Sequence, residues 1–240
     1  MGMNSVEIQA KRLLVDQWNN VVTQLERLNV PGTRPIDGYQ IFMLIDYPKV
    51  EGQIAFTVNP VTFNVPERAD GSADMYITVK GRIYLDEQAV RTNRKLTTVS
   101  FGTEVAYFRM RQGKLNHVYG AHYDFSLNEI GHPIFHAQMK SFVERGQLVS
   151  DIFTLDCEWE DHIANVLRTV RVPTAQMDFF ALVLQICADH LMSKNSSAEQ
   201  RDAFEHLRKA SYSIQGAGHL WAQLADAAPC MRTHHWYRSA

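Results

Sequence analysis

Residues 97–125 read TTVSFGTEVAYFRMRQGKLNHVYGAHYDF, and this stretch decides the fold. It contains two long segments rich in Val, Thr, Tyr and Phe, the residue types that favour β-strands. Only Gln112 and Gly113 separate the two segments, a spacing typical of a tight hairpin turn. The stretch therefore predicts two antiparallel strands, Thr97–Arg111 and Lys114–Phe125, joined directly to each other.

Segments of similar composition lie on both sides of this hairpin. Turn signals such as Asp70-Gly71 separate several of them, and short turns between long strands favour antiparallel pairing. We therefore expect a twisted antiparallel sheet of about five or six strands, spanning residues 38–139 or thereabouts. The alternation of side chains changes near Gly81, where we expect a β-bulge and a change of face. The further predicted strands are Tyr39–Ile45, Ile54–Asn59, Met75–Leu85 and His132–Met139.

A long amphipathic helix is predicted before the sheet, over residues 3–29. Its apolar positions recur at helical spacing and form one stripe, and Pro31-Gly32 ends the pattern. Such a stripe has to be buried, and we expect it to pack on the sheet. The stripe consists of Leu14, Trp18, Val21, Leu25 and Leu28.

The remaining part, residues 140–240 approximately, is predicted to be mainly helical. The apolar segment Ala175–Met192 predicts a helix with Thr174 as its N-cap. A capping box then opens another helix that runs to Ser213 or so, and two pairs fit that pattern: Ser196 with Glu199, or Ser197 with Gln200. Without an evident linker or repeat, residues 1–240 are interpreted as a single α+β domain.

Composition excludes several classes of protein. The 240 residues carry a formal net charge of −2, so the chain has no global attraction to nucleic acid or to an anionic membrane. The longest apolar run, Phe179–Leu191, is too short and too polar to span a bilayer. Three widely spaced cysteines argue against a disulfide framework and fit a reducing cytoplasm. We therefore expect a cytoplasmic protein with no membrane association.

Histidine is concentrated in residues 122–138, HYDFSLNEIGHPIFHAQ. In a hairpin, side chains of equal parity share one face, so this segment separates into a polar stripe and an aromatic stripe. A register with His122 opposite His136 keeps the two stripes apart. The polar stripe contains the candidate catalytic residues His122, Asp124, His132, His136 and Gln138.

Three interpretations of this stripe remain open. Imidazoles and a carboxylate are ligands for a divalent metal ion. Two histidines can also serve as general base and general acid without metal, with Asp124 orienting one imidazole and Gln138 contacting the substrate. Finally, the exposed face of an antiparallel hairpin is polar in any case, and that explains the same residues without a function.

Several of these elements together resemble an uncharacterised bacterial family, a domain of unknown function. The resemblance covers residues 115–192 roughly and rests on Tyr119–Phe125, on His132-Pro-Ile-Phe-His136 with Gln138, and on Arg171-Val-Pro173 leading into Met177–Leu191. Such families tend to occur among toxin–antitoxin and phage-defence genes. The resemblance implies a bacterial conflict-system protein, and it implies no established reaction.

Two functions are therefore expected as alternatives. One is a histidine-dependent nuclease or other hydrolase, with RNA suggested as substrate only by the family resemblance. The other is a non-enzymatic binding or assembly subunit of a defence or toxin–antitoxin complex. In that case the amphipathic helix or the aromatic strands would contact a protein partner or a second copy of the chain.

Overall fold

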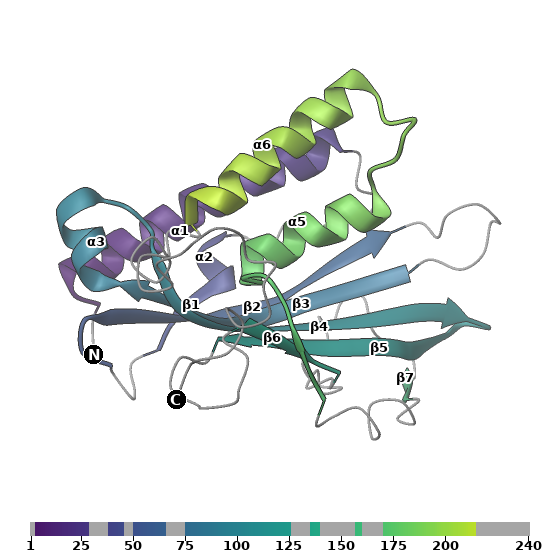
Figure 1. The fold of residues 1–240 in the computed structure, drawn as a ribbon, viewed down its shortest axis with the longest axis horizontal. Helices are drawn as coiled ribbons and strands as arrows, with labels where there is room; N and C mark the ends of the chain where they lie inside the picture. The colour runs from purple at the N-terminus through teal and green to yellow at the C-terminus, as the bar shows by residue number, and fades with distance from the viewer. Residues whose placement is uncertain are drawn as a thin grey trace.

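In the computed structural model the helices cover one face of a twisted sheet (Figure 1). The opposite face of the sheet carries none of the described helices in this view. The structure describes residues 3–28, 38–45, 50–65, 75–125, 135–139, 157–159 and 170–214.

Within these described ranges the sheet contains eight strands, and β1 to β6 form its antiparallel body. The predicted α+β class with an antiparallel sheet is thus confirmed. Two strands of three residues each extend the body: β8 pairs antiparallel with β6, and β7 pairs parallel with β5. The strands are β1 (Phe42–Leu44), β2 (Gln53–Val65), β3 (Met75–Asp86), β4 (Thr98–Arg111), β5 (Lys114–Phe125), β6 (Phe135–Gln138), β7 (Cys157–Trp159) and β8 (Arg171–Pro173).

The hairpin between β4 and β5 forms where the sequence predicts it. Arg111 pairs with Lys114, so Gln112 and Gly113 alone make the turn. Both turn residues have positive φ, 51° and 76°, as a two-residue turn of the favoured type requires. Glycine adopts this geometry without steric cost, and Gln112 is held in it by the long strands on either side.

The predicted bulge and change of face near Gly81 do not occur in β3. The bulge lies in the neighbouring strand, β2. Val58 pairs with Gly81 and Val61 with Val79, so Asn59 and Pro60 of β2 together oppose one residue of β3. Proline has no N–H to donate to a ladder, which explains why the bulge forms there.

The first helix, α1, runs over Ser5–Arg27, slightly inside the predicted range 3–29. Asn4 caps it, accepting hydrogen bonds from the backbone N–H groups of Val6 and Glu7. The predicted apolar stripe is buried as expected. Its partners include helices as well as the sheet, because the Trp18 ring lies 5.5 Å from the Phe179 ring of α5.

Two short helices interrupt the strands. The first, α2 (Gly38–Ile41), occupies part of the segment predicted as the strand Tyr39–Ile45. The successive residues Ile41 and Phe42 are both fully buried, which the alternation of a single strand does not permit. The other, α3 (Glu87–Asn93), connects β3 to β4 and is capped by Asp86.

Helix α5 covers Phe179–His190 and begins later than predicted, with Asp178 as its N-cap in place of Thr174. The chain is still extended at Thr174, whose backbone N–H donates to the Phe135 carbonyl. Pairing with β6 therefore overrides the local capping signal.

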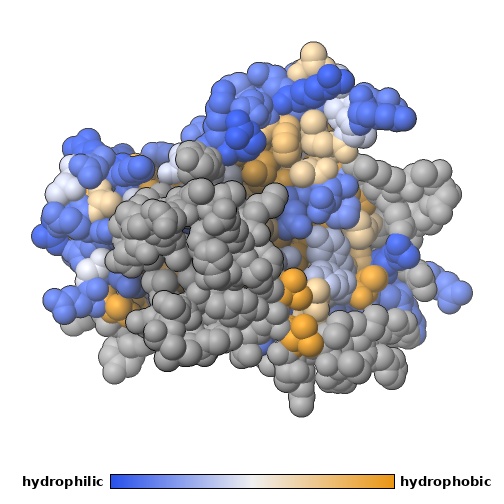
Figure 2. Space-filling model, in the orientation of Figure 1, coloured by the Kyte–Doolittle hydropathy of each residue, from blue (hydrophilic) through white to orange (hydrophobic). Residues whose placement is uncertain are grey.

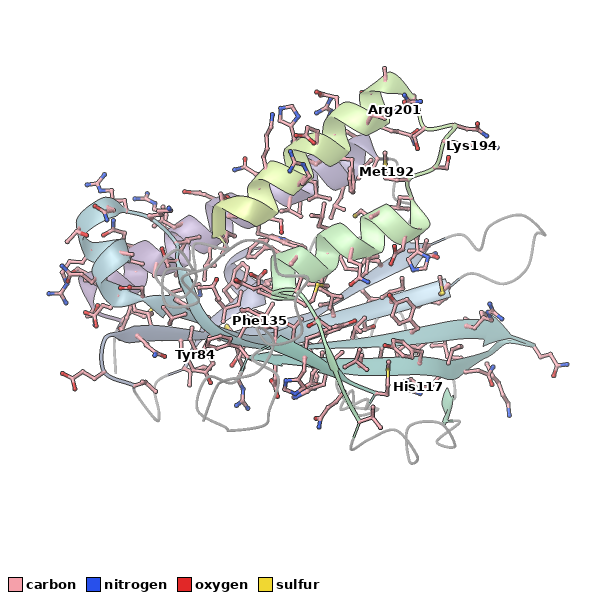
Figure 3. The ribbon with its side chains drawn as sticks, viewed as in Figure 1. Tyr84, His117, Phe135, Met192, Lys194 and Arg201 are labelled. Carbon is pink, nitrogen blue, oxygen red and sulfur yellow. The ribbon has the colours of Figure 1, made fainter. Side chains whose placement is uncertain are left out.

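Helix α6 (Ala198–Ile214) begins with the second of the two predicted capping boxes. The Ser197 hydroxyl accepts from the Gln200 N–H, and the Gln200 side chain accepts from the Ser197 N–H. Arg201 fixes the α5–α6 connection by donating to the Ser196 and Lys194 carbonyls, near Met192 (Figure 3).

The main core lies between the helices and the sheet. Hydrophobic residues gather between α6 and α5, whereas hydrophilic residues line the outer side of α6 (Figure 2). On the opposite sheet face a small apolar cluster, Ala106, Phe108 and Leu115, lies near the β4–β5 turn. Among the described residues, no helix is both long and apolar enough to cross a membrane.

The buried cap of α5 leads to a testable pH dependence. Burial raises the pKa of the Asp178 carboxyl from 3.8 to about 6, although hydrogen bonds from Ala181, Gln176 and Phe180 oppose the shift. The folded protein then binds this proton more tightly than the unfolded chain does. The free energy of unfolding should therefore fall as pH rises from about 3 to about 7, by roughly 3 kcal/mol for this group.

The variant Asp178→Asn keeps an oxygen acceptor for the cap but does not titrate. In urea titrations across this pH range we expect its stability to lack that fall and to exceed the wild-type value above pH 6 or so. Parallel stability curves for the two proteins would contradict the assignment. The variant Asp178→Ala, which loses the cap, should cost about 1 kcal/mol.

Candidate functional site

Polar residues and one glycine form two rows across the sheet face that lies opposite the helices. Antiparallel partners share a face, so the strand register defines each row. The first row contains Arg82, Gly102, Asp124 and His136 from β3, β4, β5 and β6. The second row contains Lys80, Glu104, His122 and Gln138 from the same strands.

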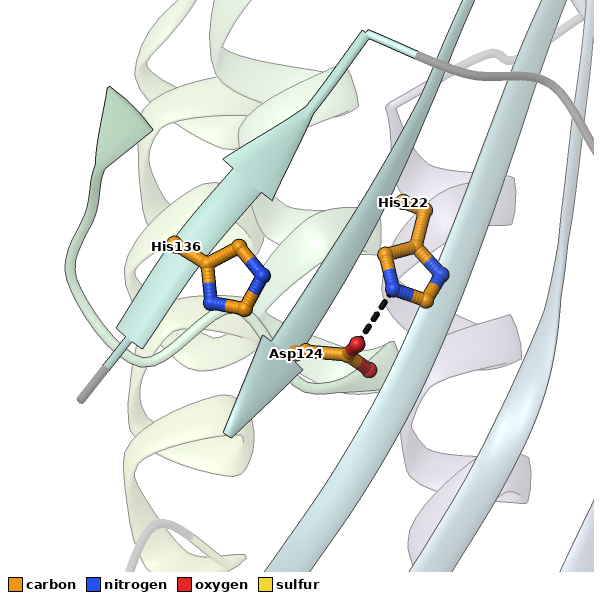
Figure 4. Close-up of side chains that lie close together, drawn as sticks. All are labelled: His122, Asp124 and His136. Carbon is orange, nitrogen blue, oxygen red and sulfur yellow. Dashed lines mark hydrogen bonds and ion pairs between the residues drawn. The ribbon is translucent and has the colours of Figure 1, made fainter. Parts of the chain in front are cut away.

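Three side chains of these rows converge: His122, Asp124 and His136 (Figure 4). His122 Nε2 and Asp124 Oδ2 are joined by a hydrogen bond. The His136 ring is centred 6.5 Å from the His122 ring, and one ligand atom from each of the three residues lies within 4.8 Å of the others. We call this group the triad.

The members of the triad differ in exposure. His136 is only 2% exposed. The side chains of His122 and Asp124 are 18% and 35% exposed, so solvent reaches the triad from the β5 side.

The structure thus brings together three of the five candidate residues. Gln138 lies opposite His122 on the same face, half-buried, and is not part of the triad. His132 lies outside the described residues.

The predicted register is wrong by two residues: Asp124, and not His122, pairs with His136. A shift of two preserves every face, so the polar and apolar pattern could not distinguish the two registers. The observed one places Phe125 opposite Phe135, with ring centres 5.2 Å apart, and Phe101 stacks on both at 6.3 and 6.1 Å. Aromatic packing on the helix-facing side therefore sets the alignment on the other side.

Beside the triad the sheet face forms a hollow with a volume of about 640 Å³. His122 and Asp124 line one wall, and the bulge of β2 lines another. The lining residues are Thr57, Val58, Asn59, Pro60, Lys80, Gly81, Arg82, Gly102, Glu104, His122 and Asp124.

Charged residues in this hollow were not among the sequence candidates. Lys80 Nζ lies 3.1 Å from a Glu104 carboxylate oxygen, whereas Arg82 is exposed and has no hydrogen bond or ion pair to any described residue. The alternation Lys80-x-Arg82 and Gly102-x-Glu104 is visible in the sequence. Placing these residues beside His122 requires the register of β3 against β4 and of β4 against β5. The sequence pattern does not provide that register.

Two glycines have different roles in this region. A Cβ added at Gly81 would meet the Gly102 carbonyl oxygen at 2.4 Å, a backbone clash. A Cβ at Gly102 would meet one described atom within 4 Å, the Asp124 Oδ1 at 3.2 Å. Gly102 therefore leaves a space between Arg82 and Asp124, which we call the Gly102 gap.

The triad has the donor set of a transition-metal site. Two imidazole nitrogens and one carboxylate oxygen are usual ligands of zinc and of iron(II), with coordination positions left for water or substrate. Tetrahedral bonds to zinc place ligand atoms about 3.3 Å apart, so the triad atoms need to close by roughly 1.5 Å at most. Rotation of the three side chains would have to provide that movement, because the paired strands hold the backbone in place.

Comparisons with known proteins found no family model, no curated protein and no solved structure that matches this chain. The resemblance to an uncharacterised bacterial family therefore stays a prediction.

The two glycines give a prediction about stability. Gly81→Ala should destabilise the protein by about 3 kcal/mol, because a backbone atom has to move. Gly102→Ala should cost less than about 1 kcal/mol, because only the end of the Asp124 side chain has to move. Urea denaturation of both variants measures the difference, and equal losses would show that the Gly102 gap is not open.

Proposed function

We propose that this protein is a metal-dependent hydrolase in which His122, Asp124 and His136 hold a divalent transition-metal ion, with RNA as its substrate. The observation that carries the proposal is the convergence of the triad, whose ligand atoms lie within 4.8 Å of one another beside an open hollow. Two paired strands supply all three residues, so the backbone pairing fixes the spacing of their Cα atoms.

The donor set selects the class of ion. Imidazole nitrogen favours zinc, iron and nickel over calcium and magnesium, which prefer oxygen ligands. Three protein ligands are typical of zinc sites that take part in catalysis, since structural sites use four. The coordination positions left by the triad are available to water and to a group bound in the hollow.

The geometry favours this chemistry over metal-free catalysis by two histidines. In that mechanism the imidazoles would have to flank a negatively charged phosphodiester. Asp124, however, is hydrogen-bonded to His122 and lies close to His136. A carboxylate at that place repels a phosphodiester and attracts a cation.

The bound ion would lower the pKa of its water to about 7 and so supply a nucleophile near neutral pH. In the overall hydrolysis the water oxygen bonds to phosphorus and the bond from phosphorus to the leaving oxygen breaks. One proton of the water ends on that leaving oxygen. RNA as substrate, and a role in bacterial toxin–antitoxin or phage defence, belong to the proposal through the family resemblance alone.

The proposal predicts that cleavage of RNA depends on metal and on each member of the triad. Protein treated with EDTA should be inactive, and zinc, manganese or iron(II) should restore cleavage of a fluorescently labelled RNA. Each of the variants His122→Ala, Asp124→Ala and His136→Ala should lower the rate of cleavage by more than about 100-fold. Replacing a residue that only supports a metal ligand typically costs about 10- to 100-fold, and the loss of a ligand itself should exceed that.

His206→Ala is the matched control, because this histidine lies on α6, away from the triad, with a side chain that is 51% exposed. It should keep full activity. If the EDTA-treated protein cleaves RNA at the original rate, the metal-dependent mechanism is wrong. If no divalent ion supports cleavage by the intact protein, the proposal of a hydrolase is wrong. Light scattering would then test the alternative, a binding or assembly role.

A further inference from the structure

The Gly102 gap separates a cation from the triad. Arg82, Gly102 and Asp124 are successive members of one cross-strand row. Neighbouring strands lie about 4.8 Å apart, so the Cα atoms of Arg82 and Asp124 are roughly 10 Å apart. Glycine at the middle position leaves the interval without a side chain, and Asp124 Oδ1 is the one described atom near it.

Among the described residues, Arg82 is the cation of the hollow that has no carboxylate paired with it. Lys80 lies two residues away on the same face, but Glu104 pairs with it at 3.1 Å. Arg82 is exposed and makes no ion pair with the described part of the chain. Guanidinium is planar and always charged, and its fork of N–H groups matches two phosphate oxygens.

We infer that the Gly102 gap binds a phosphate group of the substrate, with Arg82 on one side of the phosphate and the ion of the triad on the other. This inference rests on the proposed function for the ion, and it adds the chemical class of the ligand and the residue that recognises it. Arg82 acts as a binding residue in this arrangement, and the triad carries the chemistry.

The size of the hollow agrees with such a ligand. Its volume of about 640 Å³ lies inside the range of small-molecule sites, about 300–1,000 Å³. Phosphate alone leaves most of that volume empty, which gives room for a nucleoside beside the bulge at Asn59 and Pro60.

Binding of inorganic phosphate to the zinc-loaded protein, measured by calorimetry, tests the inference without turnover. Arg82→Gln should weaken binding at least about tenfold, because a charged hydrogen bond is lost. Arg82→Lys keeps the charge but loses the fork, so its loss should be intermediate. Gly102→Ala should also weaken binding while Arg82 and the triad remain, and circular dichroism confirms that this variant is folded.

Arg91→Gln is the matched control, since Arg91 is an exposed arginine on α3 that pairs with Glu87. It should bind phosphate like the wild type, and Arg82→Gln should bind zinc like the wild type. Acetate at equal concentration should not compete. A mononucleotide and a short RNA, added separately as competitors, show whether a phosphate monoester or diester fits better, and competition by neither overturns the inference.

The outcomes separate this inference from the proposed function. Binding of phosphate that depends on Arg82, without any cleavage of RNA, supports the inference and contradicts the hydrolase. Cleavage that depends on the triad, with KM and phosphate affinity unchanged in Arg82→Gln and Gly102→Ala, supports the hydrolase and overturns the inference.

Discussion

The packing of Phe101, Phe125 and Phe135 determines how the rest of the site is arranged. These rings stack on the helix-facing side of β4, β5 and β6, where they join the main core. Their stacking fixes the register of β6 against β5, and the register places Asp124 opposite His136 on the other side. Hydrophobic packing, which has no part in the chemistry, therefore aligns the polar residues that do.

The sequence predicted the parts of the fold that depend on short-range pattern. Composition and alternation located the long strands β4 and β5, the turn at Gln112 and Gly113, and the shared face of His122, Asp124 and His136. The sequence could not predict which residues pair across neighbouring strands, because registers that differ by two residues place the same side chains on each face. For that reason Arg82 and Glu104 were missed, although their own strands were placed correctly.

The start of α5 shows a similar limit. Thr174 and Asp178 are both good caps, so local preference does not choose between them. The choice is made by β8, which stays extended to pair with β6 and delays the helix until Asp178. Burial of that carboxylate is unfavourable. The hydrogen bonds that it accepts, however, stabilise the first turn of a helix whose side chains fill the core.

The pairing of β8 with β6 also affects the order in which the site is built. β6 has four residues, and His136 in it gains a second strand neighbour only through Pro173, which follows 37 positions later. During synthesis from the N-terminus, β5 and its His122–Asp124 pair are complete long before that segment emerges. A nascent chain thus carries two of the three triad residues on a finished hairpin, and His136 is secured last.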